Sequence, residues 1–172
     1  MRSGVSITAA APVDAEAIAT IYRHYVLTSG ATFDDAAPSA GDFARKIGDV
    51  QRAGLPFLVA TNAGTVEGYG YCMPYRARPA YRFTVEDSIY IDHDRRGSGI
   101  GRRLLEALLV DSAATGMRQV VAVIADTGDP ASVVLHERCG FVHAGRLRNV
   151  GFKHDRWLDT ILMQTELSRA PG

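Results

Sequence analysis

The chain has 172 residues, of which 47% are hydrophobic and 22% charged, and its 19 Lys and Arg residues balance 19 Asp and Glu residues. These fractions are ordinary for a folded protein and exclude a disordered tail or a collagen-like rod. Zero net charge argues against a nucleic-acid partner and against a general binder of acidic surfaces. The length predicts one domain over residues 1–172.

The apolar runs and the cysteines indicate a cytoplasmic protein. The longest apolar run, residues 120–125, is too short to cross a bilayer, so no membrane partner is expected. The first residues lack the charged and apolar segments of a secretion signal. Cys72 and Cys139 both lie in apolar stretches, and we expect them to be buried, reduced thiols.

The apolar periodicity of the first half predicts two helices among short strands. Ser39 with Asp42 three positions later is typical of a helix cap. In chain order, we expect a strand at residues 6–9, a helix at 14–27, a loop at 29–38, a helix at 39–53, and a hairpin of strands at 57–61 and 66–73.

The second half predicts a strand–loop–helix–strand unit followed by closing strands. The expected elements are a loop at 76–82, a strand at 84–91, a glycine-rich segment at 95–101, a helix from 100 to about 116, a strand at 120–124, a helix at 131–139, and strands at 141–147 and 157–166. This order favours a mixed α/β (α+β) fold.

The most specific pattern is Arg95-Arg96-Gly97-Ser98-Gly99-Ile100-Gly101, between a predicted strand and a predicted helix. Glycines let backbone N–H groups approach a ligand, and a helix N-terminus favours anions, so the segment suits phosphates. A dinucleotide fingerprint is excluded because Arg102 stands where its third glycine belongs, and a P-loop is excluded because no lysine follows. A purely structural turn is the alternative, although the flanking arginines Arg96, Arg102 and Arg103 do not favour it.

The pattern Arg96-x-x-Gly99-x-Gly101 after a strand resembles the acetyl-CoA motif of the GNAT acyltransferases, whose loop holds the CoA pyrophosphate. Residues 120–124, 128–132 and 135–141 resemble the pieces that follow it in that family. The resemblance covers nearly the whole chain. It implies a central twisted mixed sheet flanked by helices, acetyl-CoA as cosubstrate, and no metal.

A narrower resemblance concerns segments outside this loop. Thr32-Phe33 and residues 78–82, 84–90, 151–153 and 156–159 resemble the phosphinothricin N-acetyltransferase subgroup, whose members acetylate phosphinothricin or methionine sulfoximine. Because these segments lie outside the CoA loop, they concern the substrate rather than the cofactor. Family members are commonly dimers, so a homodimer is expected as well.

The family resemblance also implies a set of cofactor-binding residues. They are Ile89, Tyr90, Ile91, Arg96, Gly97, Ser98, Gly99, Ile100, Gly101, Arg102, Asp129 and Ser132. The first three would pair with the pantetheine arm through their backbone, and an N–H of Tyr90 or Ile91 would meet the developing oxyanion. Asp129 stands where the subgroup is expected to have asparagine, and an ionised aspartate cannot donate a hydrogen bond.

Two residues are candidates for acid–base chemistry. Acetyl transfer to an amine requires a base, and Glu86 lies in mid-strand among β-branched residues, at the position that resembles the subgroup's base. Strand alternation places Glu86 on one face of the sheet and Asp87 on the other. The alternative for Glu86 is a strand-edge charge facing water. His136 stands where many family members have a tyrosine that protonates the thiolate, and its alternative is a surface or capping histidine.

The substrate would carry an acidic group, for which arginine forks are suited. The candidate substrate-binding residues are Phe33, Arg76, Ala77, Arg78, Arg82, Glu86, Asp87 and Ser88. Ordinary solvated loop arginines are the alternative. Residues 76–103 hold seven arginines against four acidic residues, while the segments on either side are net negative. The zero net charge therefore conceals a positive segment suited to small anions.

These observations lead to one main hypothesis and two rivals. The main hypothesis is transfer of an acetyl group from acetyl-CoA to the amino group of a small amino acid that resembles glutamate or methionine sulfoximine. The first rival is acetylation of a protein or peptide amine. The second is a catalytically silent acyl-CoA-binding module, which the presence of Glu86 disfavours.

Overall fold

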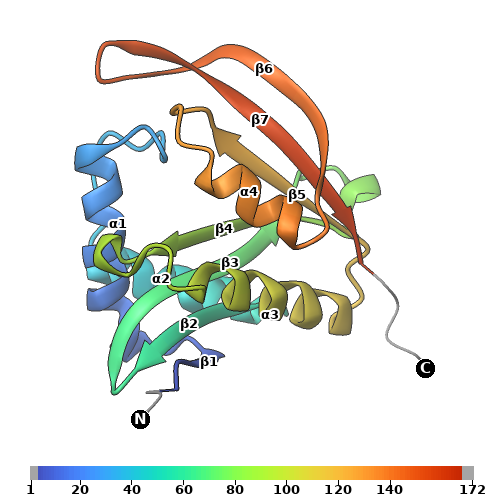
Figure 1. Cartoon of the computed structure of the whole chain (residues 1–172). Coiled ribbons are helices and arrows are strands. Elements are labelled where there is room, and N and C mark those ends of the chain that lie inside the picture. The colour runs from blue at the N-terminus through green and yellow to red at the C-terminus, as the bar shows by residue number, and fades with distance from the viewer. Residues whose placement is uncertain (1–3, 168–172) are drawn as a thin grey trace.

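The computed structural model describes residues 4–167, in which seven strands form one twisted sheet with helices on both faces (Figure 1). The strands are β1 (Ser6–Ala9), β2 (Phe57–Asn62), β3 (Thr65–Pro74), β4 (Thr84–Ile91), β5 (Gln119–Ala125), β6 (Val142–Lys153) and β7 (Arg156–Glu166). The helices are α1 (Ala15–Thr28), α2 (Ala40–Arg52), α3 (Ile100–Ala114) and α4 (Ala131–Arg138). Short 3-10 turns lie at Pro12–Asp14, Pro79–Tyr81 and His93–Arg95.

The sheet has the order β1-β2-β3-β4-β5-β7-β6, and only the central β4–β5 pair is parallel. That pair is short, because only residues 84–86 of β4 align with residues 119–121 of β5. Both strands continue beyond this point, to residues 91 and 125, without a partner between them. The two halves of the sheet therefore separate at its centre.

Alternating side chains on β3 explain why each face receives different helices. Tyr69 points to the α1 and α2 side, where its ring lies 5.9 Å from that of Phe43. Gly68 and Gly70 point to the other side, where a Cβ on either would come within 3.3 Å of a leucine of α3. The apolar stripe of α3 thus packs directly against the strand backbone, and Leu104 and Leu108 are fully buried there.

The helices and the strands other than β6 agree closely with the sequence expectations. Ser39 caps α2 as predicted, since its Oγ accepts from the Asp42 N–H at 3.1 Å and Asp42 Oδ2 accepts from the Ser39 N–H at 2.8 Å. Glu86 and Asp87 lie on opposite faces of β4, since their β3 partners are Met73 and Cys72. The mixed α/β order is confirmed.

The main difference lies in β6, which was expected to end at residue 147 and instead runs to residue 153. Two register shifts against β7 interrupt it, and Asn149 within the second has a φ of +51°. The irregular stretch breaks the apolar alternation from which a strand is recognised. The last part, Gly151 to Lys153, pairs with the start of β7 and completes a long hairpin that arches over the molecule (Figure 1).

Within residues 4–167, no helix has the length and apolar character needed to cross a membrane. Cys72 is buried and Cys139 partly buried, and both are free thiols. The expectation of reduced cysteines is confirmed, and that of burial is met fully by Cys72 alone.

The close contact of α3 with β3 makes Gly70 sensitive to substitution. In Gly70→Ala, the new Cβ would lie 2.8 Å from Leu108 Cδ1 and 3.1 Å from the Ser88 carbonyl oxygen. We expect a loss of about 1–3 kcal/mol in the free energy of unfolding, measured by urea denaturation. Gly41→Ala is the control, because its Cβ would meet ordinary contacts at 3.6 Å or more in α2. Equal stability of the two variants would contradict this packing.

Candidate active site

The separation of β4 from β5 leaves backbone groups of β4 without a strand partner. The Thr84 carbonyl accepts from the N–H of Tyr75, directly after β3, at 3.1 Å, and the N–H of Asp92, directly after β4, donates to the Glu67 carbonyl of β3 at 2.9 Å. The N–H and C=O groups of successive residues point to opposite sides of a strand, so the backbone groups of Ser88 and Tyr90 also point to β3. The backbone N–H and C=O groups of Ile89 and Ile91 then point into the gap between β4 and β5. Of the two N–H groups predicted for an oxyanion, this geometry favours that of Ile91 over that of Tyr90.

Tyr25 and the aromatic residues behind β4 fix the position of this strand. The Tyr25 hydroxyl donates to the Ile91 carbonyl oxygen. The Tyr90 ring packs 5.0 Å from Tyr22 and 5.6 Å from Tyr69, measured between ring centroids. The side chain of Tyr90 therefore serves packing, and the exposed backbone edge of β4 is held rigidly.

The glycine-rich loop lies at one end of the gap and leads directly into α3. Gly97 and Gly99 have φ angles of +76° and +84°, which favour glycine, and no atom lies within 4 Å of a Cβ built on either. Gly99 is the N-cap of α3, so the first N–H groups of that helix lie at the loop. The open space and the unpaired N–H groups form a cradle suited to phosphate oxygens.

Arg96 in this loop forms an ion pair across the gap with Asp129, in the segment that precedes α4. Asp129 also accepts from the Ala131 N–H through Oδ1 at 3.0 Å. This backbone hydrogen bond and the Arg96 guanidinium hold the pKa of the Asp129 carboxyl below its usual range. Both carboxylate oxygens are engaged, so Asp129 acts here as an acceptor that positions Arg96 and the start of α4.

A cleft of about 670 Å³ runs between the two halves of the sheet, which is a usual size for a cofactor site. Many predicted residues line it. From the cofactor set these are Ile89, Tyr90, Ile91, Arg96, Gly97, Gly99, Gly101, Arg102, Asp129 and Ser132, and from the substrate set Phe33, Glu86, Asp87 and Ser88.

Six predicted residues do not line this cleft. Ser98 donates through its Oγ to the Arg95 carbonyl at 2.6 Å, and Ile100, the first residue of α3, is buried in the core. The remaining four belong to the loop after β3: Arg76, Ala77, Arg78 and Arg82. Their roles in binding stay predictions.

Glu86 is the titratable group at the inner end of the cleft. Its side chain is half-buried on β4. Burial raises the pKa of the Glu86 carboxyl, the nearby charge of Asp87 raises it further, and Arg76 opposes this by lowering it. A carboxylate with a raised pKa that faces a cleft is well suited to accept a proton near neutral pH.

His136 lies at the base of the cleft in a buried ion pair, not on the surface. It is 2% exposed and Asp87 is 7% exposed. Its Nε2 lies 3.0 Å from Asp87 Oδ2 and its Nδ1 2.7 Å from the Ser132 carbonyl oxygen. Neither partner can donate from those atoms when Asp87 is ionised, so both ring nitrogens carry hydrogen. Burial lowers the pKa of His136, but the hydrogen bonds and the charge of Asp87 outweigh it, and the pKa is raised.

The cleft also includes residues that the sequence did not single out. Ala31 and Thr32 approach it from the loop after α1, Thr127 from the loop after β5, and Arg138 from the end of α4. Tyr25 belongs to the apolar stripe of α1 and was therefore expected in the core. Arg138, close to the predicted His136, was a recognisable candidate for anion binding. Thr32 was marked only by the subgroup resemblance, and nothing in the sequence marked Ala31 and Thr127.

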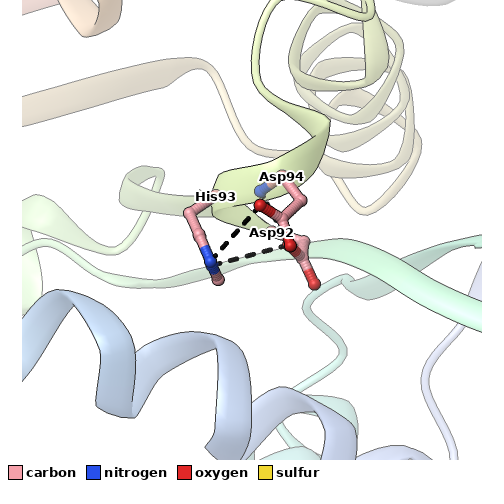
Figure 2. Close-up of side chains that lie close together, drawn as sticks. All are labelled: Asp92, His93 and Asp94. Atoms are coloured by element: carbon pink, nitrogen blue, oxygen red, sulfur yellow. Dashed lines mark hydrogen bonds and ion pairs between the residues drawn. The ribbon is translucent and has the colours of Figure 1, made fainter.

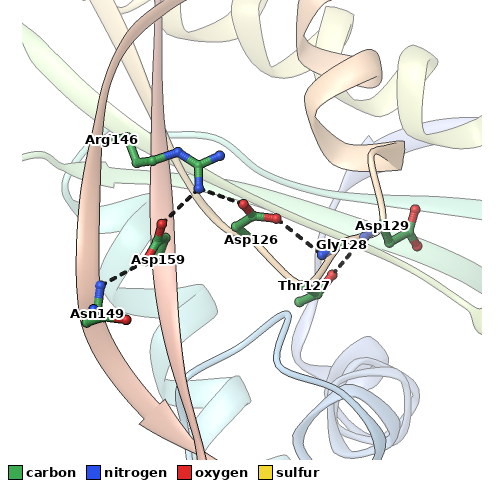
Figure 3. A network of polar contacts seen from close by, with 7 residues as sticks. All are labelled: Asp126, Thr127, Gly128, Asp129, Arg146, Asn149 and Asp159. Atoms are coloured by element: carbon green, nitrogen blue, oxygen red, sulfur yellow. Dashed lines mark hydrogen bonds and ion pairs between the residues drawn. The ribbon is translucent and has the colours of Figure 1, made fainter.

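An ion network ties the loop before α4 to the long hairpin (Figure 3). Arg146 of β6 donates to Asp126 Oδ2 at 2.7 Å and to Asp159 Oδ2 at 2.8 Å. The Gly128 N–H donates to Asp126 Oδ1 at 3.2 Å. Through these contacts the hairpin holds the segment that carries Asp129.

A second polar group, Asp92, His93 and Asp94, lies in the turn after β4 (Figure 2). His93 approaches the two carboxylates at 3.6 and 3.5 Å and stacks on His24 with the ring centroids 3.9 Å apart. Asp92 Oδ1 already accepts from the Asp94 N–H at 2.9 Å. Capping of a short turn explains the group, and we assign it no catalytic role.

Comparison with known proteins agrees with this geometry. Residues 7–162 match the family model of the acetyltransferase (GNAT) domain. The chain is 46% identical over 155 residues to a phosphinothricin N-acetyltransferase from Alcaligenes faecalis, covering 90% of this chain and 79% of that protein. It is 37% identical over 163 residues to an L-methionine sulfoximine/L-methionine sulfone acetyltransferase from Pseudomonas aeruginosa, covering 94% of each.

A solved structure shares both sequence and fold. It is a GNAT superfamily phosphinothricin acetyltransferase from Sinorhizobium meliloti in complex with acetyl-CoA, with 41% identity and a TM-score of 0.91. The match covers 95% of this chain and 89% of that one. The expected fold is thus confirmed, and the chain belongs to the GNAT family of acetyltransferases.

Proposed function

We propose that this protein transfers the acetyl group of acetyl-CoA to the amino group of a small amino acid of the phosphinothricin or methionine sulfoximine and sulfone type. The observation that carries the proposal is that Glu86, a half-buried carboxylate, lines the same cleft as the glycine and arginine cradle of α3. A proton acceptor and a phosphate site in one cleft are what amine acetylation by acetyl-CoA requires. The names of the two curated relatives support the substrate class.

The residues at the outer end of the cleft fit acetyl-CoA. The open cradle at Gly97 and Gly99 and the α3 N-terminus suit its diphosphate, and Arg96 and Arg102 line the same wall. The unpaired backbone of Ile91, which lies along the chain between Glu86 and the cradle, suits the amide-bearing pantetheine arm. When bound, acetyl-CoA supplies an acetyl thioester, whose carbonyl carbon the amine attacks.

Glu86 and a backbone N–H of β4 act on the reacting groups. Glu86 takes a proton from the acceptor ammonium, directly or through a water molecule, so that the nitrogen lone pair is free. The Ile89 N–H, which faces the gap three residues from Glu86, donates to the carbonyl oxygen as negative charge develops; the predicted Ile91 N–H lies five residues from Glu86, about 16 Å along the strand. The C–N bond forms, the C–S bond breaks, and the electron pair leaves with sulfur.

His136 keeps its predicted role as the acid for the departing thiolate in this proposal. Its imidazolium form carries two protons, which it donates to Asp87 and to the Ser132 carbonyl oxygen, so one of these hydrogen bonds has to break when the proton passes to sulfur. The same pairing compensates the buried Asp87 charge, which otherwise raises the pKa of Glu86 further. Through this contact His136 also helps to keep Glu86 ionised.

Two further expectations extend the proposal. We place the protein in the cytoplasm, in keeping with its free thiols, and we propose that it acts as a homodimer. The hairpin of β6 and β7 exposes large apolar side chains that a second copy would cover. These are Val142, Leu147, Val150, Phe152 and Trp157.

The substrate class is tested by following free thiol release from acetyl-CoA with a panel of amines. The panel contains phosphinothricin, methionine sulfoximine, methionine sulfone, glutamate and a peptide mixture. We expect turnover with the first three. Turnover on peptides alone would support the peptide acetyltransferase, and tight CoA binding without any turnover would support a silent binding module.

Glu86→Gln tests the base directly through the pH profile. Because the pKa of Glu86 is raised, wild-type kcat/KM for the acceptor should rise as pH increases through that pKa and ionises the carboxylate. In the variant we expect a loss of about 10²–10⁴-fold near pH 7. The loss should shrink toward pH of about 9–10, where an aliphatic amine loses its own proton. Glu137→Gln, on the exposed side of α4, is the control, and a wild-type profile for Glu86→Gln removes Glu86 from this role.

Arg96→Gln tests the assignment of the cradle to the CoA phosphates. Loss of one charge-assisted hydrogen bond, about 1.5–3 kcal/mol, should raise KM for acetyl-CoA by about 10–100-fold. A short acetyl thioester without the nucleotide should be used equally well by variant and wild type. Arg103→Gln is the matched control, because Arg103 bonds to the Val5 carbonyl at 2.6 Å and does not line the cleft. Equal losses with both thioesters would refute the assignment.

Trp157→Glu tests the homodimer, since Trp157 is 64% exposed on the hairpin. Light scattering after gel filtration should give twice the mass of one chain for the wild type and the mass of one chain for the variant, because a buried carboxylate at an apolar interface is costly. Val13→Glu, at an exposed site outside the hairpin, should remain dimeric. A monomeric wild type would disprove this proposal.

A further inference from the structure

The loop between α1 and α2 is held against the tip of the β6–β7 hairpin, although the two are far apart in sequence. Gly151 of β6 and Leu158 of β7 are cross-strand partners, and both contact this loop. A Cβ on Gly30 would lie 2.8 Å from Leu158 Cδ1, so Gly30 is pressed against the hairpin. Residues 30–33 therefore rest on one strand pair.

The closest of these contacts joins Gly151 to Phe33. A Cβ built on Gly151 would lie 2.4 Å from two carbons of the Phe33 ring and 2.9 Å from a third. The ring thus occupies the space that any other residue would fill at this position. Because an aromatic ring is rigid, it would have to move as a whole to make room for a methyl group.

Lys153, two residues further along β6, bonds through its side chain to the backbone of the loop. Lys153 is 4% exposed, and its Nζ donates to the Thr32 carbonyl oxygen at 2.7 Å. Burial lowers the pKa of Lys153, while the charges of Asp35 and Asp34 oppose this by raising it. A buried ammonium needs such compensation, which indicates that the loop and the hairpin are adapted to each other.

The loop is held from its other side by α1. The Tyr22 hydroxyl lies 2.5 Å from Thr32 Oγ1 and donates to Asp34 Oδ2 at 2.6 Å. Residues 32–34 are therefore fixed between the hairpin and the aromatic cluster behind β4. This matters because Thr32 and Phe33 line the cleft together with Glu86 and Ser88.

We propose that Gly151 and Lys153 are positioning residues that set acceptor specificity by holding Phe33 as the wall of the acceptor end of the cleft. The inference rests on the proposed function, because it assigns the site of the amino-acid acceptor. The acceptor amine meets Glu86, and the carbon chain of the acceptor lies against the Phe33 ring. The absence of a side chain at Gly151 lets the Phe33 ring pack against β6, and Lys153 fixes the position of the Thr32 backbone.

Gly151→Ala is the principal test, with Gly145→Ala as the matched control on the same strand. The Gly145 Cβ would lie 4.0 Å from Leu162 Cδ1, which is an ordinary contact. In Gly151→Ala we expect KM for methionine sulfone and phosphinothricin to rise about tenfold or more, since small displacements at a reacting site are costly. KM for acetyl-CoA should stay within about twofold, because the cradle of α3 lies at the other end of the cleft.

A double-mutant cycle with Phe33→Leu separates positioning from general damage. The smaller side chain removes the contact, so Gly151→Ala should add little to the effect of Phe33→Leu alone. An additive effect, an unchanged acceptor KM, or an equal rise in the KM for acetyl-CoA would each overturn the proposal. Lys153→Met keeps the apolar stem and loses the hydrogen bond to Thr32, and should shift the acceptor KM in the same direction.

A second readout does not depend on turnover. Hydrogen exchange at the backbone amides of residues 30–34, measured without substrate, should accelerate in Gly151→Ala and Lys153→Met and remain unchanged in Gly145→Ala. If the wild-type protein acetylated no amino acid while this exchange responded as expected, the proposed substrate class would fail. The role of Gly151 and Lys153 in holding residues 30–34 would stand. Unchanged exchange in all three variants would overturn the role of Gly151 and Lys153 in holding this loop.

Discussion

The active-site cleft depends on the early end of the parallel pairing between β4 and β5. Parallel strands normally continue their ladder as far as both extend. Here the ladder stops after residue 86 of β4, and the backbone beyond it faces open space. An unpaired strand edge inside a protein needs other partners for its N–H and C=O groups. Tyr25 supplies one at the Ile91 carbonyl, and the others are available to a ligand with amide groups of its own.

Charge in the cleft is arranged so that each ionised group has a nearby partner. Arg96 is paired with Asp129, His136 with Asp87, and Arg102 with Glu106. The chain as a whole is neutral, so its attraction for small anions comes from local arginines and helix dipoles. The exceptions are Arg138 and Glu86, since no ion pair or hydrogen bond joins their side chains to another of the described residues. Of these two, Glu86 is the half-buried one. Burial without a paired charge raises its pKa, which suits a base that must exchange protons.

The sequence allowed the local features of this site to be predicted. The glycine loop, the cap at Ser39 and the alternation along β4 each depend on neighbours within a few positions, where residue type dictates geometry. The pairing of His136 with Asp87 joins residues 49 apart, and that of Lys153 with Thr32 joins residues 121 apart. No local pattern specifies such contacts. The end of β6 was missed for a different reason, because the irregular stretch between Leu147 and Gly151 interrupts the apolar alternation of the strand.

Substrate recognition was the least predictable part of the site. The loop arginines Arg76, Arg78 and Arg82 were chosen for their chemistry, yet the structure places them outside the cleft lining. Phe33, which was predicted, and Thr32 are held at the cleft by tertiary contacts with the hairpin tip. Composition reports which groups are available, whereas tertiary contacts decide which of them line the cleft.

The central claim is that the separated edge of β4 receives the cosubstrate. Amide hydrogen exchange of β4, measured residue by residue by NMR with and without acetyl-CoA, tests it most directly. Ser88 and Tyr90 face β3 and should be protected in both states, whereas Ile89 and Ile91 should exchange faster in the free protein and become protected on binding. Equal protection of all four amides in the free protein, or no change at Ile89 and Ile91 on binding, would contradict this account.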